Sequence, residues 1–115
     1  MYKENIFTKI INKEITNEVI YEDESVLAFK DINPVASVHI LVIPKGLYVD
    51  YADFMQRSTI EEINHYFKVI ANIAKQFCGD AFKLCMNQGG KAGQTIFHFH
   101  THIIGGEEFF AHLNV

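Results

Sequence analysis

The amino-acid sequence predicts an α+β fold, in which helices pack on one face of a mainly antiparallel sheet. The first observation behind this prediction is one segment of about 20 residues whose apolar side chains recur at helical spacing. The second is a set of short segments rich in β-branched and aromatic residues. The third is their order along the chain: helix, hairpin, strand, long helix, hairpin.

The first half of the chain contains a short helix and three predicted strands. Residues 5–12 have apolar side chains three and four positions apart, which predicts a short amphipathic helix. Residues 18–23 and 25–32 are β-rich and are separated by acidic residues suited to a turn, so they are predicted to form a hairpin. Residues 38–44 are a near-continuous apolar run that ends at Pro44. Such a run is typical of a strand in the centre of a sheet.

The long helix is the clearest predicted element. Ser58 with Glu61, and Thr59 with Glu62, both have the spacing of an N-terminal capping box, so the helix is expected to begin at one of these two positions. Gly79 lies where a residue in a left-handed conformation would end it. The predicted apolar face consists of Ile60, Ile63, Phe67, Ile70, Ala74 and Phe77.

Two further strands are predicted at residues 81–87 and 95–104, joined by the glycine-bearing loop 88–93. The second of these strands carries a histidine at every second position. Because side chains alternate between the faces of a strand, the three imidazoles are expected on one face, open to solvent or a ligand. The other face is expected to contact the core. The histidines are His98, His100 and His102, and the core side chains are Phe97, Phe99 and Ile103.

The composition limits the class of function. The 115 residues are 49 % hydrophobic and 21 % charged, with a net charge of −4, which indicates a single globular domain over residues 1–115. The absence of a polybasic segment argues against nucleic acid and anionic membranes as partners. No apolar run approaches the roughly 20 residues that cross a bilayer, and the N-terminus lacks the core of a signal peptide. We therefore expect a cytoplasmic protein in which Cys78 and Cys85 are reduced.

Three interpretations of the histidine cluster are open on these grounds. Zinc needs its ligands within a few ångström of one another, whereas His98 and His102 would lie about 13 Å apart on an extended strand. His98 and His100 could form part of a zinc site with help from elsewhere. Incidental histidines on an open sheet face explain one imidazole better than three in strict alternation. Phosphorus chemistry is favoured, because a neutral imidazole with a pKa of about 6.5 is a good nucleophile near pH 7.

The residues just before the histidines support phosphate chemistry. The block NQGGKAGQT supplies an amide side chain, three glycines and a Gln-Thr pair. Glycines allow the backbone to approach a phosphate closely, and successive N–H groups can bind an anion. A glycine-rich loop alone is more often a hairpin turn than a ligand site. Its position next to the histidines is what favours a ligand.

The block HFHTHII fits the His-x-His-x-His-x-x motif of the histidine-triad (HIT) family, and the chain resembles the Hint branch of small nucleoside phosphoramidases. The blocks FKDINP and HILVIPK, in order upstream, make this resemblance specific. It covers residues 5 to about 106. The C-terminal tail, residues 107–115, lacks the Trp-Pro-Pro-Gly type of ending that is common in close Hint relatives and influences their substrate choice across a dimer.

The resemblance implies a HIT-like fold with about five antiparallel strands, one long helix and one short helix, and a homodimer that joins two such sheets. It also implies an activity, the hydrolysis of nucleoside 5′-phosphoramidates or related nucleotidyl compounds at the α-phosphorus. The reaction would pass through a nucleotidyl-histidine and release a nucleoside monophosphate, with no cofactor and no metal. The expected substrate carries a purine, as an adenosine or guanosine nucleotide.

The same resemblance implies roles for individual residues. His100 would attack the phosphorus and His102 would assist protonation of the leaving group, while His98 and His39 would orient them. Asp31 would hold the ribose hydroxyls. Phosphate contacts are implied for Asn87, Gly93, Gln94 and Thr95, and apolar walls around the base for Phe7, Ile10, Phe29 and Ile32.

These assignments have alternatives in ordinary structure and in other functions. Asp31 could cap a strand end, His39 could be a hydrogen-bonded histidine in a buried strand, and the apolar residues could be plain core. A dinucleoside polyphosphate hydrolase is a second possible enzyme. A non-catalytic module that binds a nucleotide or a protein partner is a third reading of the same residues.

Overall fold

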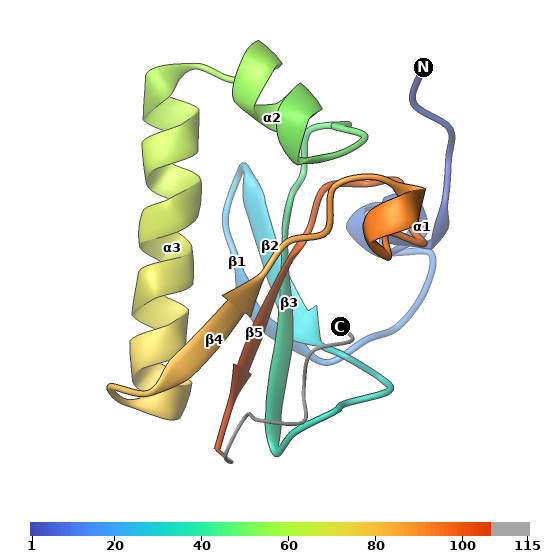
Figure 1. Ribbon diagram of the computed structural model, residues 1–115. Coiled ribbons are helices and arrows are strands. Elements are labelled where there is room, and N and C mark those ends of the chain that lie inside the picture. Colours follow the sequence, from blue (N-terminus) through green and yellow to red (C-terminus); the bar gives the residue numbers. More distant parts are fainter. Residues whose placement is uncertain (107–115) are drawn as a thin grey trace.

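The computed structural model describes residues 1–106 of the chain. Within this range five strands form one antiparallel sheet, in the order β1-β2-β3-β5-β4 (Figure 1). The strands are β1 (Val19–Glu22), β2 (Val26–Lys30), β3 (Val38–Pro44), β4 (Phe82–Cys85) and β5 (Thr101–Gly105). The helices are α1 (Ile6–Ile11), α2 (Tyr51–Arg57), α3 (Ile60–Cys78) and the 3₁₀ turn η1 (Gly90–Ala92). The predicted α+β fold with an antiparallel sheet is confirmed, while the C-terminal tail, residues 107–115, lies outside the described residues.

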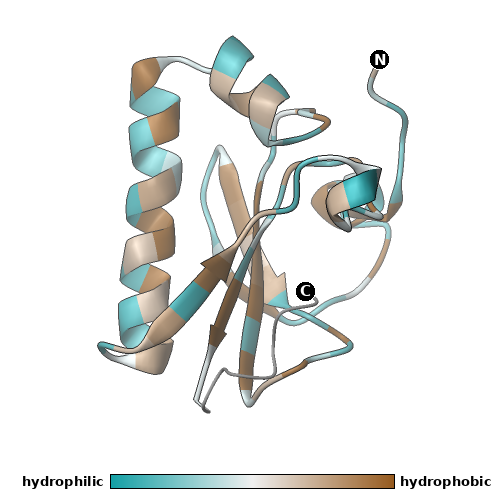
Figure 2. Ribbon diagram, in the orientation of Figure 1, coloured by the Kyte–Doolittle hydropathy of each residue, from teal (hydrophilic) through white to brown (hydrophobic). Residues whose placement is uncertain are grey.

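β3 lies at the centre of the sheet, as its apolar run predicts. It pairs with β2 along one edge and with β5 along the other. Every residue of β3 after the first is buried, and Figure 2 shows much of β2, β3 and β5 in the colour of hydrophobic residues. The predicted β1–β2 hairpin is also present. Since β5 lies between β3 and β4, the last strand joins the two halves of the sheet.

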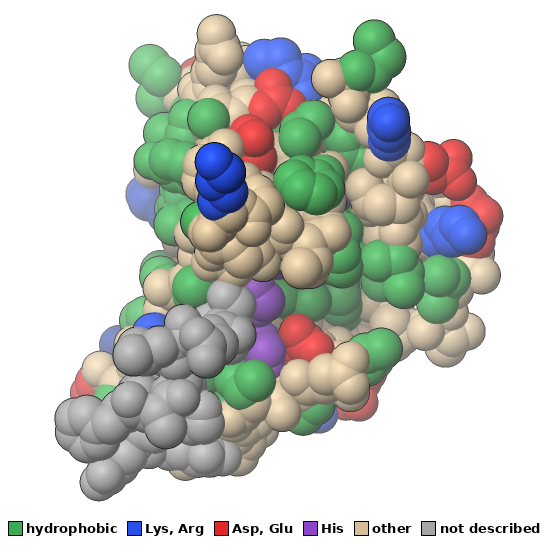
Figure 3. Space-filling view, turned by 45° about the vertical axis from the view of Figure 1, so that its right-hand side comes forward, with side chains coloured by type: hydrophobic (Ala, Val, Ile, Leu, Met, Phe, Trp, Pro, Cys, Tyr) green, Lys and Arg blue, Asp and Glu red, His purple; other side chains and the backbone are tan. Residues whose placement is uncertain are grey.

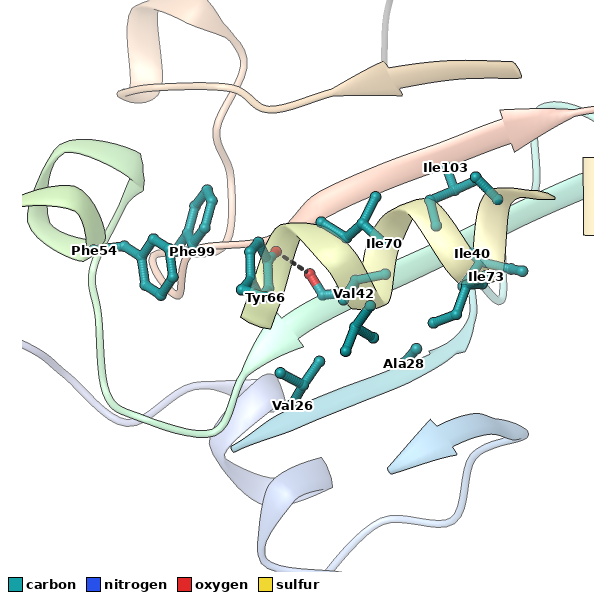
Figure 4. Close-up of a cluster of buried hydrophobic side chains, with 12 residues drawn as sticks. Val26, Ala28, Ile40, Val42, Phe54, Tyr66, Ile70, Ile73, Phe99 and Ile103 are labelled. Atoms are coloured by element: carbon teal, nitrogen blue, oxygen red, sulfur yellow. Dashed lines mark hydrogen bonds between the residues drawn. The ribbon is translucent and has the colours of Figure 1, made fainter. Parts of the chain in front are cut away.

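Different helices cover the two faces of the sheet, so the prediction that the helices lie on one face is wrong. Successive residues of β2 and β3 point to opposite faces, and their apolar runs therefore need cover on both sides. On the face of α3, the sheet contributes Val26, Ala28, Ile40, Val42 and Ile103 (Figure 4). On the opposite face, Phe7 and Ile10 of α1 pack with Leu27, Phe29, Leu41 and Ile43.

α3 begins at the second of the two predicted capping boxes. The Thr59 side chain accepts from the Glu62 N–H, and the Glu62 carboxylate accepts from the Thr59 N–H. Ser58 instead ends α2, a helix that the sequence patterns do not anticipate and whose N-cap is Asp50. Gly79 ends α3 with a positive φ of 73°, which a glycine adopts without steric strain.

The buried face of α3 is rotated from the predicted one. Ile60 and Phe77 are 83 % and 39 % exposed, so the two ends of the predicted face do not reach the core. Ile63 and Phe67 pack at its edge. The buried side chains of α3 are Tyr66, Val69, Ile70, Ile73 and Ala74. Within residues 1–106, none of the helices combines the length and apolar character that a membrane crossing demands.

β5 is shorter than predicted, because it begins at Thr101 rather than at residue 95. Its pairing with β3 starts where Thr101 meets Val42, and β3 ends two residues beyond Val42, at Pro44. In this register residues 95–98 lie beyond the end of β3, and residues 100 and 99 are not paired with Ile43 and Pro44 either. The backbone of residues 95–100 bonds instead to the loop after β3, where the Phe99 N–H donates to the Tyr48 carbonyl (2.8 Å). His98 and His100 thus precede the strand, and only His102 lies on it.

Candidate functional site

A cavity of about 510 Å³ opens beside α1 and the ends of β2 and β5. Figure 3 shows histidine and acidic side chains in a hollow on this side of the molecule, with hydrophobic side chains around it. The cavity contains all the predicted site residues except His98 and Gln94. Its apolar wall includes Phe7, Ile10, Phe29, Ile32 and Leu41, and its polar wall includes Asp31, His39, Asn87, Gly93, Thr95, His100 and His102.

The ring of His100 is held so that one nitrogen keeps a free lone pair. Its Nδ1 lies 2.7 Å from the main-chain carbonyl oxygen of His98. A carbonyl can only accept, so Nδ1 carries the proton and donates it to this oxygen. In the neutral ring Nε2 is then unprotonated. Because His100 lines the cavity, it offers a nucleophilic nitrogen there.

His39 fixes the opposite tautomer on His102. The Val35 N–H donates to Nδ1 of His39 (3.1 Å), so the proton of a neutral His39 resides on Nε2. That Nε2 lies 2.9 Å from Nδ1 of His102 and 3.3 Å from an oxygen of Asp31. His102 Nδ1 therefore accepts from His39, and the His102 proton is on Nε2. The cavity thus has a lone pair on His100 and an N–H donor on His102.

Burial lowers the pKa of all four imidazoles, because it disfavours the charged ring. The pKa of His98 falls to about 4 and that of His102 to about 3, with burial as the main cause in each. Burial also lowers the pKa of His100 and of His39, while the negative charge of Asp31 opposes the shift in both. All four rings are neutral at pH 7.

The polar wall of the cavity lies within a region that matches a known family. A family model described as the HIT domain matches residues 12–109. The chain belongs to the HIT family. The alternating histidines of the chain are thus the histidine triad after which this family is named.

Individual HIT relatives and one solved structure agree with this membership. An uncharacterized HIT-like protein of Rickettsia prowazekii is 54 % identical over 114 residues, which are 97 % of this chain and 95 % of that protein. The purine nucleoside phosphoramidase of Escherichia coli is 38 % identical over 108 residues, which are 92 % of this chain and 90 % of the enzyme. A HIT family hydrolase from Clostridium thermocellum superposes with a TM-score of 0.80 at 34 % identity, covering 94 % of this chain and 95 % of that structure.

His98, the first member of the HIT motif, lies behind the cavity rather than on its wall. It is fully buried, which contradicts the expectation of three imidazoles on one open face. Its Nε2–H donates to the Pro44 carbonyl (2.7 Å). Phe97 is 46 % exposed and so does not supply the predicted core contact, whereas Phe99 and Ile103 do. The cause is the non-strand backbone of residues 95–100, along which side chains do not alternate.

Gln94 also lies outside the cavity wall. Its side chain is buried and bonds only to the main chain: it accepts from the Gly89 N–H (2.9 Å) and donates to the carbonyls of Val49 (2.9 Å) and Ile96 (3.1 Å). The amide therefore holds the loop that carries Gly93 and Thr95. Gly93 itself has a φ of 103°, a conformation that glycine adopts readily and other residues avoid.

Asp31 and residues of the apolar wall contribute both to the fold and to the lining of the cavity. One oxygen of Asp31 accepts from the Asn33 N–H (2.8 Å), which is the local turn expected of a strand-end aspartate, and the other lies near His39. Phe7, Ile10 and Phe29 are core residues that also line the cavity. Ile32, at 82 % exposed, is not core at all and lies on the rim.

Two residues near the site carry no signal in the sequence. Asn17 lines the cavity, and its Nδ2 is buried without a hydrogen-bond partner among residues 1–106. Tyr2 lies outside the cavity, but its hydroxyl is 2.6 Å from Nδ1 of His98. Neither residue belongs to a periodic pattern or to the HIT motif, so only the three-dimensional arrangement identifies them.

Asp31, His39 and His102 lie close enough together to surround a metal ion, since one ligand atom of each lies within 4.8 Å of the others. A metal ion would need a lone pair on the nitrogen of His39 that faces the other two residues. That nitrogen, Nε2, carries the ring proton because Val35 N–H already donates to Nδ1. The three residues therefore fit a hydrogen-bonded chain and do not fit a metal ion.

Proposed function

We propose that this HIT protein is a hydrolase that cleaves nucleoside 5′-phosphoramidates at the α-phosphorus through His100. The observation that carries the proposal is the hydrogen bond from His100 Nδ1 to the His98 carbonyl. It leaves Nε2 with a free lone pair on the wall of a cavity large enough for a nucleotide. The similarity to a purine nucleoside phosphoramidase supports the substrate class.

The first chemical step is attack of His100 Nε2 on the α-phosphorus. The P–N bond of the phosphoramidate breaks, and the nucleotide becomes attached to His100. The departing nitrogen takes a proton from the imidazolium form of His102, whose Nε2–H faces away from His39, and His102 is left as a neutral ring. An anionic phosphate in the cavity favours the protonated form of His102, which strengthens this acid role.

The second step is hydrolysis of the nucleotidyl-histidine. A water molecule attacks the phosphorus, the bond to His100 breaks, and a nucleoside monophosphate is released. One proton of the water passes to His102 and restores its imidazolium form. His100 returns to its starting tautomer, because the His98 carbonyl still accepts from Nδ1. The protein completes the cycle with its own side chains.

The walls of the cavity support a nucleotide as the substrate. The apolar wall of Phe7, Ile10 and Phe29 suits a planar base, with Ile32 at the rim. The Asp31 carboxylate suits ribose hydroxyls. Asn87, Thr95 and the backbone at Gly93 lie on the polar wall with the histidines, where they suit phosphate oxygens. A purine base, a homodimer and a cytoplasmic location are further parts of the proposal that rest on the resemblance or on the sequence.

The test is turnover of adenosine 5′-phosphoramidate by the wild-type chain and by His100→Ala. We expect the substitution to lower kcat by at least about 10³-fold, because no other group on the cavity wall has the nucleophilic lone pair of His100. The matched control is His65→Ala, which removes a histidine of α3 bonded to Asp23, outside the cavity. This control should keep wild-type turnover.

Mass spectrometry of the protein stopped during turnover should show the nucleotide on His100. Wild-type turnover by His100→Ala, or a nucleotide on another residue, would show that the mechanism is wrong. Faster cleavage of a dinucleoside polyphosphate than of the phosphoramidate would assign the site to that substrate instead. Tight nucleotide binding without cleavage of either compound would identify a binding module.

A further inference from the structure

The hydroxyl of Tyr2 connects the N-terminal segment to the histidine motif. It lies 2.6 Å from Nδ1 of His98 and 2.8 Å from the hydroxyl of Thr8, and it accepts from Nδ2 of Asn5 (3.2 Å). The rings of Tyr2 and His98 meet edge to face, with centroids 5.5 Å apart. Tyr2 and His98 are 96 positions apart in the sequence.

The Pro44 carbonyl, at one end of this series of hydrogen bonds, determines which group donates in each of them. His98 Nε2 faces the Pro44 carbonyl, which can only accept, so the His98 proton is on Nε2 and Nδ1 accepts. The Tyr2 hydroxyl is therefore the donor to His98. Thr8 in turn donates to the Tyr2 oxygen, while its own oxygen accepts from the Asn5 N–H (3.3 Å). Each hydrogen bond in this chain therefore has one defined donor and one defined acceptor.

The chain of bonds ends at the nucleophile. The ring of His98 is held on both nitrogens, by Tyr2 and by Pro44. The main-chain carbonyl of the same residue accepts from His100 Nδ1 at 2.7 Å and so fixes the reactive tautomer of His100. The peptide group of this carbonyl is held on two sides: its own N–H, that of Phe99, donates to the Tyr48 carbonyl (2.8 Å), and the adjoining His98 ring is held by Tyr2 and Pro44.

We propose that Tyr2 is a positioning residue for catalysis, which acts on His100 through the ring and carbonyl of His98. This inference rests on the proposed function for its kinetic consequence, but the bond itself is a separate claim. Asn5 supports the same arrangement, since its Nδ2 also reaches the Phe97 carbonyl at 3.5 Å. The N-terminal segment thus holds Phe97 and His98, at the start of the histidine motif, by hydrogen bonds.

The experiment compares Tyr2→Phe with Tyr21→Phe in the full chain, with any purification tag at the C-terminus. Each change removes one tyrosine hydroxyl from a partly buried hydrogen bond of 2.6 Å, but the Tyr21 bond goes to Asp23, away from the cavity. We expect Tyr2→Phe to lower kcat about fivefold to tenfold with little change in KM, because one hydrogen bond that holds the nucleophile is lost. Tyr21→Phe should leave both constants unchanged.

A second readout does not depend on turnover. In ¹⁵N NMR of the histidine rings, the wild-type protein should show His98 protonated on Nε2 and His100 protonated on Nδ1. In Tyr2→Phe the Nδ1 signal of His98 should move, and His100 should populate both tautomers. Tyr21→Phe should give the wild-type pattern.

The two claims fail in different ways. If the wild-type chain cleaves no phosphoramidate but the NMR pattern is as expected, the proposed substrate is wrong and the positioning role stands. If kcat of Tyr2→Phe equals that of Tyr21→Phe, or only KM rises, or the tautomer of His100 is unchanged, Tyr2 merely anchors the N-terminal segment and the inference is overturned.

Discussion

At the scale of the residue, main-chain groups set the tautomers of His39, His98 and His100, and His39 in turn sets that of His102. Val35 N–H holds His39, the Pro44 carbonyl holds His98, and the His98 carbonyl holds His100. Main-chain groups cannot change their protonation at neutral pH, so each ring keeps one tautomer. The division of labour between the lone pair of His100 and the donor of His102 follows from these contacts.

Substitution of Gln94 tests whether its side chain binds the substrate or stabilises the loop. Gln94→Ala leaves the Gly89 N–H and the carbonyls of Val49 and Ile96 without their side-chain partner in a buried place. We expect the free energy of unfolding to fall by about 1–3 kcal/mol. Urea denaturation measures this change.

The matched comparison for Gln94→Ala is Gln88→Ala, a nearby substitution whose side chain bonds to Ala52 and Asp50 in an exposed place. It should cost much less stability, because water replaces the lost partners. If Gln94→Ala unfolds like the wild type but raises KM strongly, the amide contacts phosphate, as the resemblance implies.

The sequence predicts which residues gather at the cavity better than it predicts their contacts. Asp31, His39, His100 and His102 line one cavity. The burial of His98 and the inward-facing amide of Gln94 depend on the path of residues 95–100, which no side-chain pattern defines. Tyr2 could not be predicted at all, because its partner is 96 positions away.

At the scale of the element, the sequence predicts where helices and strands exist better than where they end. β5 begins at Thr101, where its pairing with Val42 of β3 starts, and residues 95–98 would lie beyond the end of β3 at Pro44 in this register. The run TIFHFHTHII alone gives no sign of this limit. Likewise, α3 buries Tyr66 and Val69 rather than Ile60, since contact with the sheet chooses among several apolar stripes on one helix.

The Tyr66 hydroxyl links α3 to strands β3 and β5 by hydrogen bonds. This buried hydroxyl donates to the Val42 carbonyl of β3 (2.8 Å) and accepts from the Thr101 hydroxyl of β5 (2.8 Å), as Figure 4 shows for Val42. We expect Tyr66→Phe to lower the free energy of unfolding by about 1–3 kcal/mol, because both partners are left unsatisfied in the core. Thermal or urea unfolding measures the loss.

Tyr51→Phe is the control for this prediction, because Tyr51 is 39 % exposed on α2 and water can solvate its hydroxyl. It should change stability by no more than about 0.5 kcal/mol. Equal stability of Tyr66→Phe and the wild type would mean that the hydroxyl does not fasten the helix to the sheet.

At the scale of the whole molecule, the buried neutral histidines make folding sensitive to mild acid. The pKa values of His98 and His102 are about 4 and 3 in the folded chain, against about 6.5 when unfolded. Between these values the unfolded chain binds more protons, so stability rises with pH. The contribution is complete above about pH 6.5 and is lost as the pH falls toward 4.

We expect the free energy of unfolding to fall between pH 7.5 and pH 5 by about 1–2 kcal/mol for each of these two histidines. The carboxylates with lowered pKa, such as Asp53, stay ionised in both states over this range and do not obscure the effect. Urea denaturation at the two pH values measures it. The same stability at both pH values would contradict neutral burial of the triad.

The order of the strands also bears on how the protein emerges from the ribosome. Residues 1–44 supply α1 and the antiparallel strands β1, β2 and β3, which can pair as they are made. The outer edge of β3 then stays unpaired until residues 101–105 arrive, although every residue of β3 after the first is buried in the finished sheet. During synthesis this edge is a site where nascent chains can pair with one another. β5, which directly follows His98 and His100 in the sequence, is therefore also the strand that covers this edge of β3.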